Sequence, residues 1–571
     1  MKILDRINLS IFRFILFFTL LLSINGLSQK IETTHQLFSD QVKELLRHRI
    51  ETSGNPPKIS VGEEIIHSSL MLPLFYEQRT FIPAWIGANG PLPHVNDFLH
   101  AVHNANEHGM RPNDYHFQKI ESILEEINKN RKQKSPLNPG RSVDLDLLLT
   151  DSFLVYASHL LAGRVNPQTF DPEWHANRRE MHLVRLLEKS LEENNIQKSL
   201  ESLLPFYVGY HDLKQTFMKY QKIAAQGGWP TIQASYSIKK DDMGERVERL
   251  RERLIITDNL KSETVSDPTI FDESLEQAVY KFQQRHGLAV DGIVGPDTLA
   301  ALNVPIEQRI SQIELNLERW RWLPQNLGEN YILVNIANFE LDVIEESHTI
   351  MTMRAVVGKT YRRTPVFSDK ITYLVINPSW LIPPSIAVQD ILPQIKKDPE
   401  YLSRQNIKVL IGWGADAKEI DPKTINWIAL SPKEFPYRFI QEPGPLNSLG
   451  KIKFMFPNKF NVYLHDTPAK DLFGKSSREF SSGCIRIEKP LELAEYVLRE
   501  DTKWTKEAIL IAVKKGTEQT IRLPQPIPIH LLYWTAWVDQ DGTLQFRNDI
   551  YGRDTLLKKA LEKEPPCFDK D

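Results

Sequence analysis

The spacing of apolar residues changes near Pro324 and divides the chain into a helical part and a β-rich part. Before this point apolar residues recur every three or four positions, as they do across residues 147–161. After it, segments such as "YILVNIANFELDVIEE" and "TYLVINPSW" alternate with period two and are rich in β-branched and aromatic residues. Since domains commonly hold roughly 100 to 200 residues, we expect a multidomain α+β protein with three or four domains.

The first 28 residues have the pattern of an export signal. Basic residues precede an apolar run at 14–24, and small residues follow it at Gly26 and Ser28. A membrane-spanning helix needs about 20 apolar residues, so this shorter run is typical of a cleaved signal peptide, with an uncleaved anchor as the alternative. We therefore expect residues 1–28 to direct the chain out of the cytoplasm, to the periplasm or cell envelope.

The net charge and the number of cysteines argue against two classes of protein: nucleic-acid-binding proteins and exported proteins that depend on disulfides. The formal net charge is only −3, which does not favour a nucleic-acid partner, because such proteins present a strongly basic face. The two cysteines are Cys484 and Cys567, whereas exported proteins that depend on disulfides carry clustered, even-numbered cysteines. A disulfide between these two residues is the alternative to a free thiol at Cys484.

Residues 33–260 are predicted to form a helical scaffold domain, with helix breaks at Gly163 and Gly227.

Residues 271–303, "FDESLEQAVYKFQQRHGLAVDGIVGPDTLAALN", have the apolar spacing and glycine turns of a small three-helix unit. This unit resembles the peptidoglycan-binding type 1 domain. A connecting helix is expected at 304–324. His286 has no second histidine or cysteine at metal-ligand spacing, so we predict no metal site there.

The two side chains best suited to catalysis lie at the ends of one loop. The segment "NVYLHDTPAKDLFGKSSREFSSGCIRI" joins His465 to Cys484. A free thiol with a pKa near 8.5 is mostly protonated at neutral pH, and a neighbouring imidazole can take its proton. The backbone amides of Gly483 and Cys484 are candidate donors to an oxyanion. A buried structural cysteine and an unrelated core histidine fit the spacing equally well.

The combination of a histidine, a connection of more than a dozen residues and Ser-x-Gly-Cys resembles the signature of L,D-transpeptidases with a YkuD-type catalytic domain. The segments "RRTPVFSDKITYLVINPSWLIPPS" and "GPLNSLGKIKFMFPN" are similar to the YcbB-like branch of that family. The resemblance implies a catalytic domain at 330–515, a capping insertion at 382–447 that covers the cleft, and a C-terminal extension at 516–571. The commonest family signature has histidine where this chain has Ser482.

The resemblance also implies a reaction that needs no cofactor. Cys484 would attack the diaminopimelyl carbonyl of a peptidoglycan tetrapeptide stem, release D-alanine, and pass the acyl group to the amine of a second stem, which makes a 3→3 cross-link. Hydrolysis by the same acyl-enzyme, as an L,D-carboxypeptidase, and a non-catalytic peptidoglycan-binding scaffold protein are the alternatives. The resemblance leaves room for transient association with the membrane or with cell-wall synthases.

Other residues near the nucleophile have weaker assignments. Arg486 meets either a stem carboxylate or a structural salt-bridge partner. Tyr463 either lines the cleft or packs within its strand. Asp466 is a candidate to orient His465 through its carboxylate, although a backbone carbonyl often does this in the family. Ser481 and Ser482 are expected to shape the turn and to supply N–H or hydroxyl donors.

Overall fold

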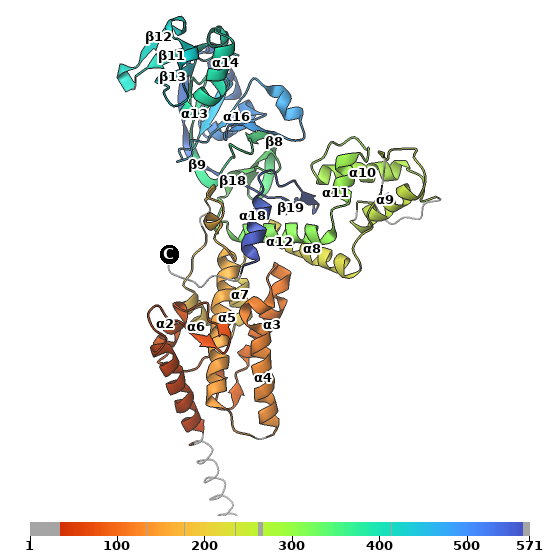
Figure 1. Cartoon of the computed structure of the whole chain (residues 1–571), viewed down its shortest axis with the longest axis vertical. Coiled ribbons are helices and arrows are strands. Elements are labelled where there is room, and N and C mark those ends of the chain that lie inside the picture. The colour runs from red at the N-terminus through yellow and green to blue at the C-terminus, as the bar shows by residue number, and fades with distance from the viewer. Residues whose placement is uncertain are drawn as a thin grey trace, which may run out of the picture. The chain divides into compact units, whose positions relative to one another are not determined.

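The computed structural model describes residues 33–563 apart from 34, 134, 176–177, 234–235, 258, 261–266 and 413. The expected signal peptide at 1–28 and Cys567 lie outside the described residues. The chain divides into two compact units (Figure 1). The first contains residues 1–165, 179–206 and 561–571, and the second contains residues 166–178 and 207–560.

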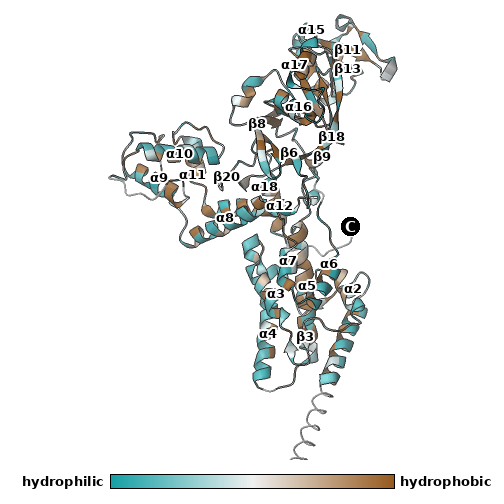
Figure 2. Cartoon of the chain, turned by 180° about the vertical axis from the view of Figure 1, so that it is seen from behind, coloured by the Kyte–Doolittle hydropathy of each residue, from teal (hydrophilic) through white to brown (hydrophobic). Residues whose placement is uncertain are grey.

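The first unit is helical and is built around one long apolar helix, α5. Asn138 caps this helix by accepting a hydrogen bond from the Arg141 amide at 3.2 Å, and Gly163 ends it at a φ of 80°. By length and composition α5 could cross a membrane, but 94% of its apolar window is buried, so it is the core helix of this unit (Figure 2). Residues 35–51 are also helical. The other helices of the unit are α2 (Met71–Gln78), α3 (His94–His103), α4 (Phe117–Lys132), α5 itself (Pro139–Ala162), α6 (Leu183–Glu192) and α7 (Ile196–Glu201).

A small helical module lies within the second unit. Its helices are α9 (Glu245–Ile256), α10 (Glu273–Arg285) and α11 (Pro296–Leu302). Their shared core begins at Ile232, before the range 271–303 expected from the sequence, because α9 and the segment that precedes it supply part of the apolar surface. His286 is buried in this module and stacks on Phe282, with ring centroids 3.9 Å apart, so it acts as a packing residue. Two further helices flank the module in the sequence, α8 (Val208–Ala225) before it and α12 (Ile306–Arg321) after it. These two helices pack against each other.

The β-rich part forms one sheet whose strand order closes on itself. The order β14-β15-β17-β8-β7-β6-β18-β9 is completed by a pairing of β14 with β9. Most neighbours are antiparallel, but β15 with β17 and β18 with β6 are parallel. The strands are β6 (Asn330–Asn335), β7 (Glu340–Glu345), β8 (His348–Gly358), β9 (Val366–Ile376), β14 (Ile452–Met455), β15 (Leu464–His465), β17 (Ile485–Ile487) and β18 (Gln519–Leu532).

Residues beyond 516 contribute to this sheet. Strand β18 pairs with β9 along most of its length and with β6 near its end, so it joins two strands that would otherwise be edges. The family resemblance implied that 516–571 is a C-terminal extension outside the catalytic domain. Two helices separate β18 from the strands that precede it. These helices are α16 (Pro490–Leu498) and α17 (Lys506–Lys515), and a hairpin of β19 (Ala536–Val538) and β20 (Leu544–Phe546) and helix α18 (Arg553–Leu561) follow β18.

A second, smaller sheet is inserted between β9 and β14, where the family resemblance implied a cap. Its strand order is β10-β13-β11-β12, and all neighbouring strands are antiparallel. It has its own apolar core, which includes Trp427 and Phe439 and the short helices beside the sheet (Figure 1). The elements are β10 (Trp380–Ile382), α13 (Pro384–Ile386), the π-helical turn η4 (Ala387–Ile391), α14 (Leu392–Lys397), α15 (Tyr401–Arg404), β11 (Ile407–Ile411), β12 (Lys418–Ile420) and β13 (Tyr437–Gln441). The multidomain α+β class predicted from the sequence is confirmed.

Candidate active site

Two neighbouring strands bring His465 and Cys484 together. Strands β15 and β17 are parallel, with His465 opposite Arg486, and Cys484 directly precedes β17. The Ile485 amide donates to the Tyr463 carbonyl at 3.1 Å, which extends the pairing beyond the two strands. Because side chains alternate along a strand, Tyr463, His465, Cys484 and Arg486 lie on the same face of the sheet. Separate segments of the sequence therefore meet at one site.

The His465 ring is held in one tautomer. Its Nδ1–H donates to the backbone carbonyl of Asp466, which can only accept, so Nε2 is left as the basic nitrogen. The ring is buried. Burial, together with the nearby positive charges of Arg486 and Lys453, lowers the pKa of His465 to about 3. The imidazole is therefore neutral, and able to accept a proton, throughout the physiological pH range.

The Asp466 carboxylate has a different task from the one its position suggested. One oxygen accepts from the Lys451 amide at 2.8 Å, and the other accepts from the Thr467 amide at 2.7 Å and from Lys470 Nζ at 2.6 Å. These bonds fix the turn that follows β15. Asp466 thus orients His465 through its carbonyl oxygen, while its carboxylate holds the backbone that presents this carbonyl.

The Cys484 thiol is free and half-buried. Burial raises the pKa of this thiol, and hydrogen bonds from Tyr463 and the charges of Lys453 and Arg486 partly offset the increase. The thiol donates to the Asn461 carbonyl at a distance of 3.7 Å. Across the described residues, no hydrogen bond joins Sγ to the His465 ring. The resting pair is therefore a neutral thiol beside a neutral imidazole.

The turn before Cys484 depends on Ser481 and Gly483. The Ser481 hydroxyl accepts from the Gly483 amide at 3.1 Å and donates to the Cys484 carbonyl at 2.5 Å. Gly483 has a φ of 113°, which strains any residue with a Cβ, and its carbonyl accepts from the Thr364 hydroxyl at 2.9 Å. Since the Gly483 amide is occupied, the Cys484 amide, which has no acceptor among the described residues, is the N–H left for an oxyanion.

Arg362 was not singled out from the sequence, although it lies in the quoted segment "RRTPVFSDK". Its Nη1 donates to the Ser482 hydroxyl at 2.9 Å and forms an ion pair with Asp390, and its Nη2 donates to Gln389 at 2.6 Å. Gln389 and Asp390 belong to η4 of the cap. One guanidinium therefore joins the turn that carries Cys484 to the capping subdomain.

Lys453 is a second residue that sequence reasoning missed. It lies on β14 opposite His465, and its Nζ is 3.8 Å from the centroid of the Tyr463 ring. The alternation in "IKFMF" carried the signal: Ile452 and Phe454 are buried in the core, so Lys453 must point to the other face, where the catalytic residues lie.

Arg486 is placed on the catalytic face without a structural ion pair. Across the described residues no carboxylate lies within ion-pair distance of its guanidinium, and its buried Nε has no hydrogen-bond partner. Tyr463, beside it on the neighbouring strand, is largely buried, and its ring centroid is 5.7 Å from that of His465. The site thus groups a thiol, a neutral imidazole and two cations.

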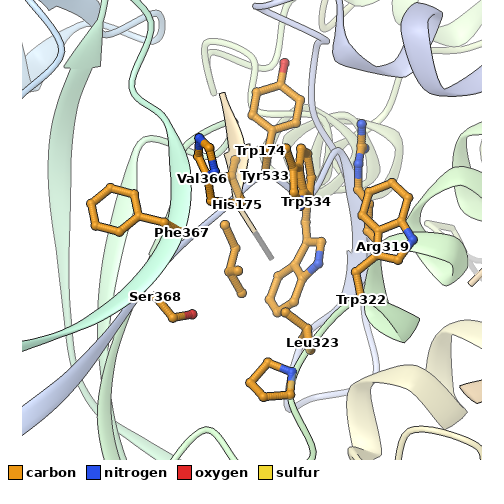
Figure 3. Close-up of a pocket in the computed structure, with 12 residues that line it drawn as sticks. Trp174, His175, Arg319, Trp322, Leu323, Val366, Phe367, Ser368, Tyr533 and Trp534 are labelled. Carbon is orange, nitrogen blue, oxygen red and sulfur yellow. The ribbon is translucent and has the colours of Figure 1, made fainter. Parts of the chain in front are cut away.

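A separate cavity lies on another part of the sheet. Figure 3 shows Trp174, Trp322 and Trp534 around it, with Phe367 and Ser368 from β9 on the opposite wall. Its charged lining residue Arg319 is already paired with Asp554 at 2.6 Å. The cavity contains neither Cys484 nor His465, and we regard it as a gap in aromatic packing.

Within the described part of the chain, no three His, Cys, Asp or Glu side chains are grouped to hold a metal ion.

Three family models match successive parts of the chain. A scaffold domain matches residues 71–217, a putative peptidoglycan binding domain matches residues 243–302, and an L,D-transpeptidase catalytic domain of the YkuD type matches residues 329–519. The last range contains every residue of the site described above. The chain carries an L,D-transpeptidase catalytic domain. The resemblance to this family and to the peptidoglycan-binding module is confirmed by these matches.

One curated relative is named for the same family. A putative L,D-transpeptidase of Haemophilus influenzae is 37% identical over 257 residues, which are 44% of this chain and 50% of the relative. The chain therefore matches about half the length of this curated relative. Solved L,D-transpeptidases from Xylanimonas cellulosilytica and Mycobacterium smegmatis are 14% and 12% identical, cover 52% and 36% of this chain and 99% and 58% of their own, and align with TM-scores of 0.17.

Proposed function

We propose that this protein is a cysteine-dependent L,D-transpeptidase that forms 3→3 cross-links between peptidoglycan stem peptides. One observation carries the proposal: parallel pairing of β15 with β17 puts His465 and Cys484 on one face, with His465 Nδ1 bound to a carbonyl. A buried structural cysteine beside an unrelated histidine would not require a fixed tautomer that leaves Nε2 basic. The L,D-transpeptidase domain match over this range agrees with the proposal.

The acylation step uses these groups in order. Sγ of Cys484 attacks the diaminopimelyl carbonyl of a tetrapeptide donor while its proton passes to His465 Nε2. The oxyanion that forms accepts a hydrogen bond from the Cys484 amide. The carbon–nitrogen bond to D-alanine then breaks, and the departing amine takes the proton from Nε2. The products are a thioester on Cys484 and free D-alanine.

The second step returns the enzyme to its starting state. The side-chain amine of a second stem attacks the thioester, Nε2 takes a proton from that amine, and the proton passes to the departing sulfur. No cofactor enters, because the thioester keeps the energy of the peptide bond that was broken. Water in place of the amine would make the same enzyme an L,D-carboxypeptidase.

The other modules support a place in the cell envelope. The peptidoglycan-binding module is expected to hold the polymer near the catalytic site. Export through a signal peptide at 1–28 agrees with this substrate, because peptidoglycan lies outside the cytoplasm. Association with the membrane or with cell-wall synthases stays a prediction from the family resemblance.

The test compares wild type with Cys484→Ala and Cys567→Ser in the full chain. Chromatography with mass spectrometry would follow D-alanine release and dimer formation from disaccharide-tetrapeptide, and sedimentation would follow binding to intact sacculi. We expect Cys484→Ala to lose all turnover and keep sacculus binding, and Cys567→Ser to keep both. D-alanine release by Cys484→Ala at the wild-type rate would refute the proposal. Release without dimers would favour the carboxypeptidase.

A further inference from the structure

Lys453 occupies a position that brings a positive charge to the reacting bond. Strand β14 pairs with β15 so that Lys453 lies opposite His465, and β15 pairs with β17 so that His465 lies opposite Arg486. The three residues form one row across three strands, spaced by about 4.8 Å per strand. Cys484 is two residues before Arg486 and shares its face. The imidazole therefore has a cation on each side.

The lysine side chain lies over the Tyr463 ring and is close enough to Cys484 for their charges to interact. Its Nζ lies 3.8 Å from the Tyr463 ring centroid, and the Tyr463 carbonyl accepts from the Ile485 amide, next to Cys484. Burial lowers the pKa of Lys453, and the nearby Cys484 and Glu518 oppose this change. In its protonated form, Lys453 carries a positive charge that can bind an anion.

This ammonium group lacks the partner that its burial would call for. Lys453 is half-buried, yet across the described residues no carboxylate lies within ion-pair distance of Nζ and no oxygen accepts a hydrogen bond from it. By contrast, Lys470 on the following turn binds Asp466 at 2.6 Å. An ammonium group that is partly desolvated and has no anionic partner is costly, and a cation–π contact compensates only in part. Such a group is suited to bind an anion that arrives with the substrate.

We propose that Lys453 binds the terminal carboxylate of the donor stem, the carboxylate of the D-alanine that leaves, and so selects donors that end one residue after the scissile bond. This inference rests on the proposed function. In a tetrapeptide, the terminal carboxylate carbon is three bonds from the scissile carbonyl carbon, so it is within about 4 Å of the bond that Cys484 attacks. The acceptor amine, which is a cation before it loses a proton, would be repelled by the same lysine.

The experiment compares two donors that differ only in this carboxylate: disaccharide-tetrapeptide and its C-terminal amide. Acylation of Cys484 would be followed by intact-protein mass spectrometry in wild type, Lys453→Met, Lys453→Arg and Lys370→Met. Lys370 is an exposed lysine of the same sheet and serves as the matched control. We expect wild type and Lys370→Met to favour the acid by roughly 10- to 100-fold in kcat/KM, the value of one charge-assisted contact. Lys453→Met should lose this preference, and Lys453→Arg should keep most of it.

A second readout separates carboxylate binding from an effect on the thiol or on folding. Because Lys453 favours the thiolate, Lys453→Met should slow Cys484 alkylation by neutral iodoacetamide and should slow acylation by the amide donor to about the same extent, whereas Lys453→Arg and Lys370→Met should be alkylated at about the wild-type rate. The thermal midpoints of all four proteins should agree within a few degrees. Equal losses by Lys453→Met on the acid and the amide, both matched by the loss in alkylation, would overturn the inference. If wild type transfers neither donor, the proposed function fails and the inference fails with it. Turnover of both donors without discrimination refutes only the inference.

Discussion

The pKa of His465 is the property of a single residue that most affects the chemistry. Burial lowers it first, and the charges of Arg486 and Lys453 lower it further, to about 3. A base with this pKa stays unprotonated down to acid pH, but it takes the thiol proton only as the new carbon–sulfur bond forms. The charges beside it serve a purpose in return, because they favour the thiolate of Cys484.

Removing one of these charges should move the acid limb of the reaction. A carbapenem presents a strained lactam carbonyl that a thiolate can attack, so its adduct on Cys484 reports acylation. In wild type we expect the rate to hold as pH falls from 8 to 5, because His465 is protonated only near pH 3. Arg486→Met should raise the pKa of His465, so its rate should begin to fall at a higher pH than in wild type. Intact-protein mass spectrometry across the pH series measures this.

The control for this experiment is Arg522→Met, an exposed arginine of β18, which should retain the wild-type profile. His465→Ala should give little adduct at any pH, and Cys484→Ala should give none. An Arg486→Met profile that differs from wild type only in height, with its acid limb unmoved, would contradict the electrostatic assignment.

At the scale of elements, one arginine joins three segments that the chain brings together from afar. Arg362 follows β8, Asp390 and Gln389 lie in η4 of the cap, and Ser482 lies in the turn before β17. Gly358 makes this approach feasible, because a Cβ there would clash with the Arg362 carbonyl. The position of the cap and the shape of the nucleophile turn are therefore coupled through one side chain.

Arg362→Met should uncouple the cap from the nucleophile turn. We expect acylation by disaccharide-tetrapeptide to slow by about tenfold, the loss of ~1.4 kcal/mol, because a large donor depends on the cap for its position. Acylation by a small carbapenem should slow less. Hydrogen exchange in residues 384–397 should speed up, as expected when a contact that holds the cap is lost.

The matched control is Arg404→Met, which removes an exposed ion pair with Asp398 inside the cap. It should leave both acylation rates near wild type. Equal slowing of the two substrates by Arg362→Met, with exchange in the cap unchanged, would show that this arginine acts on the nucleophile turn alone.

At the scale of the whole molecule, His465 and Cys484 belong to one compact unit, while the other unit buries a charge network of its own. His116 donates from both ring nitrogens, to Asp151 and to Glu64, at 2.7 Å each. Asp151 lies on α5, and it also accepts from the Ser68 hydroxyl at 2.5 Å. Burial opposes protonation of His116, but the two carboxylates outweigh burial and raise its pKa.

The stability of the first unit should therefore depend on pH through His116. Because the folded pKa is raised above that of the unfolded chain, about 6.5, the stabilisation is complete below pH 6.5 and is lost as pH rises through the folded pKa. His116→Asn, which tolerates the left-handed φ of 56° at this position, should cost about 3 kcal/mol at pH 5.5 and less at pH 9. Hydrogen exchange of α5 in the full chain, at the two pH values, measures the difference.

Carbapenem acylation of Cys484 serves as the internal control, since it reports on the other unit and should be unchanged by His116→Asn. A difference in α5 exchange between wild type and variant that grows with pH would contradict the assignment of a protonated His116.

Much of this protein could be predicted from local sequence. The change from helical to alternating spacing near Pro324 predicted the α+β class, and short-range patterns identified the peptidoglycan-binding module and the candidates His465 and Cys484. These features depend on spacing within one segment, because a helix or strand shows its buried face over a few residues.

The remaining features depend on which strands pair and in what register, and spacing within one segment does not encode this. The pairing of β14 with β15 puts Lys453 beside His465, and the pairing of β18 with β9 and β6 brings residues after 516 into the catalytic sheet. The occupied Gly483 amide and the contact of Arg362 with the cap likewise arise only when distant segments meet. The sequence by itself indicated the modules and the two candidate residues, His465 and Cys484. The tertiary structure decided the charges around them, because those charges come from side chains far apart in the chain.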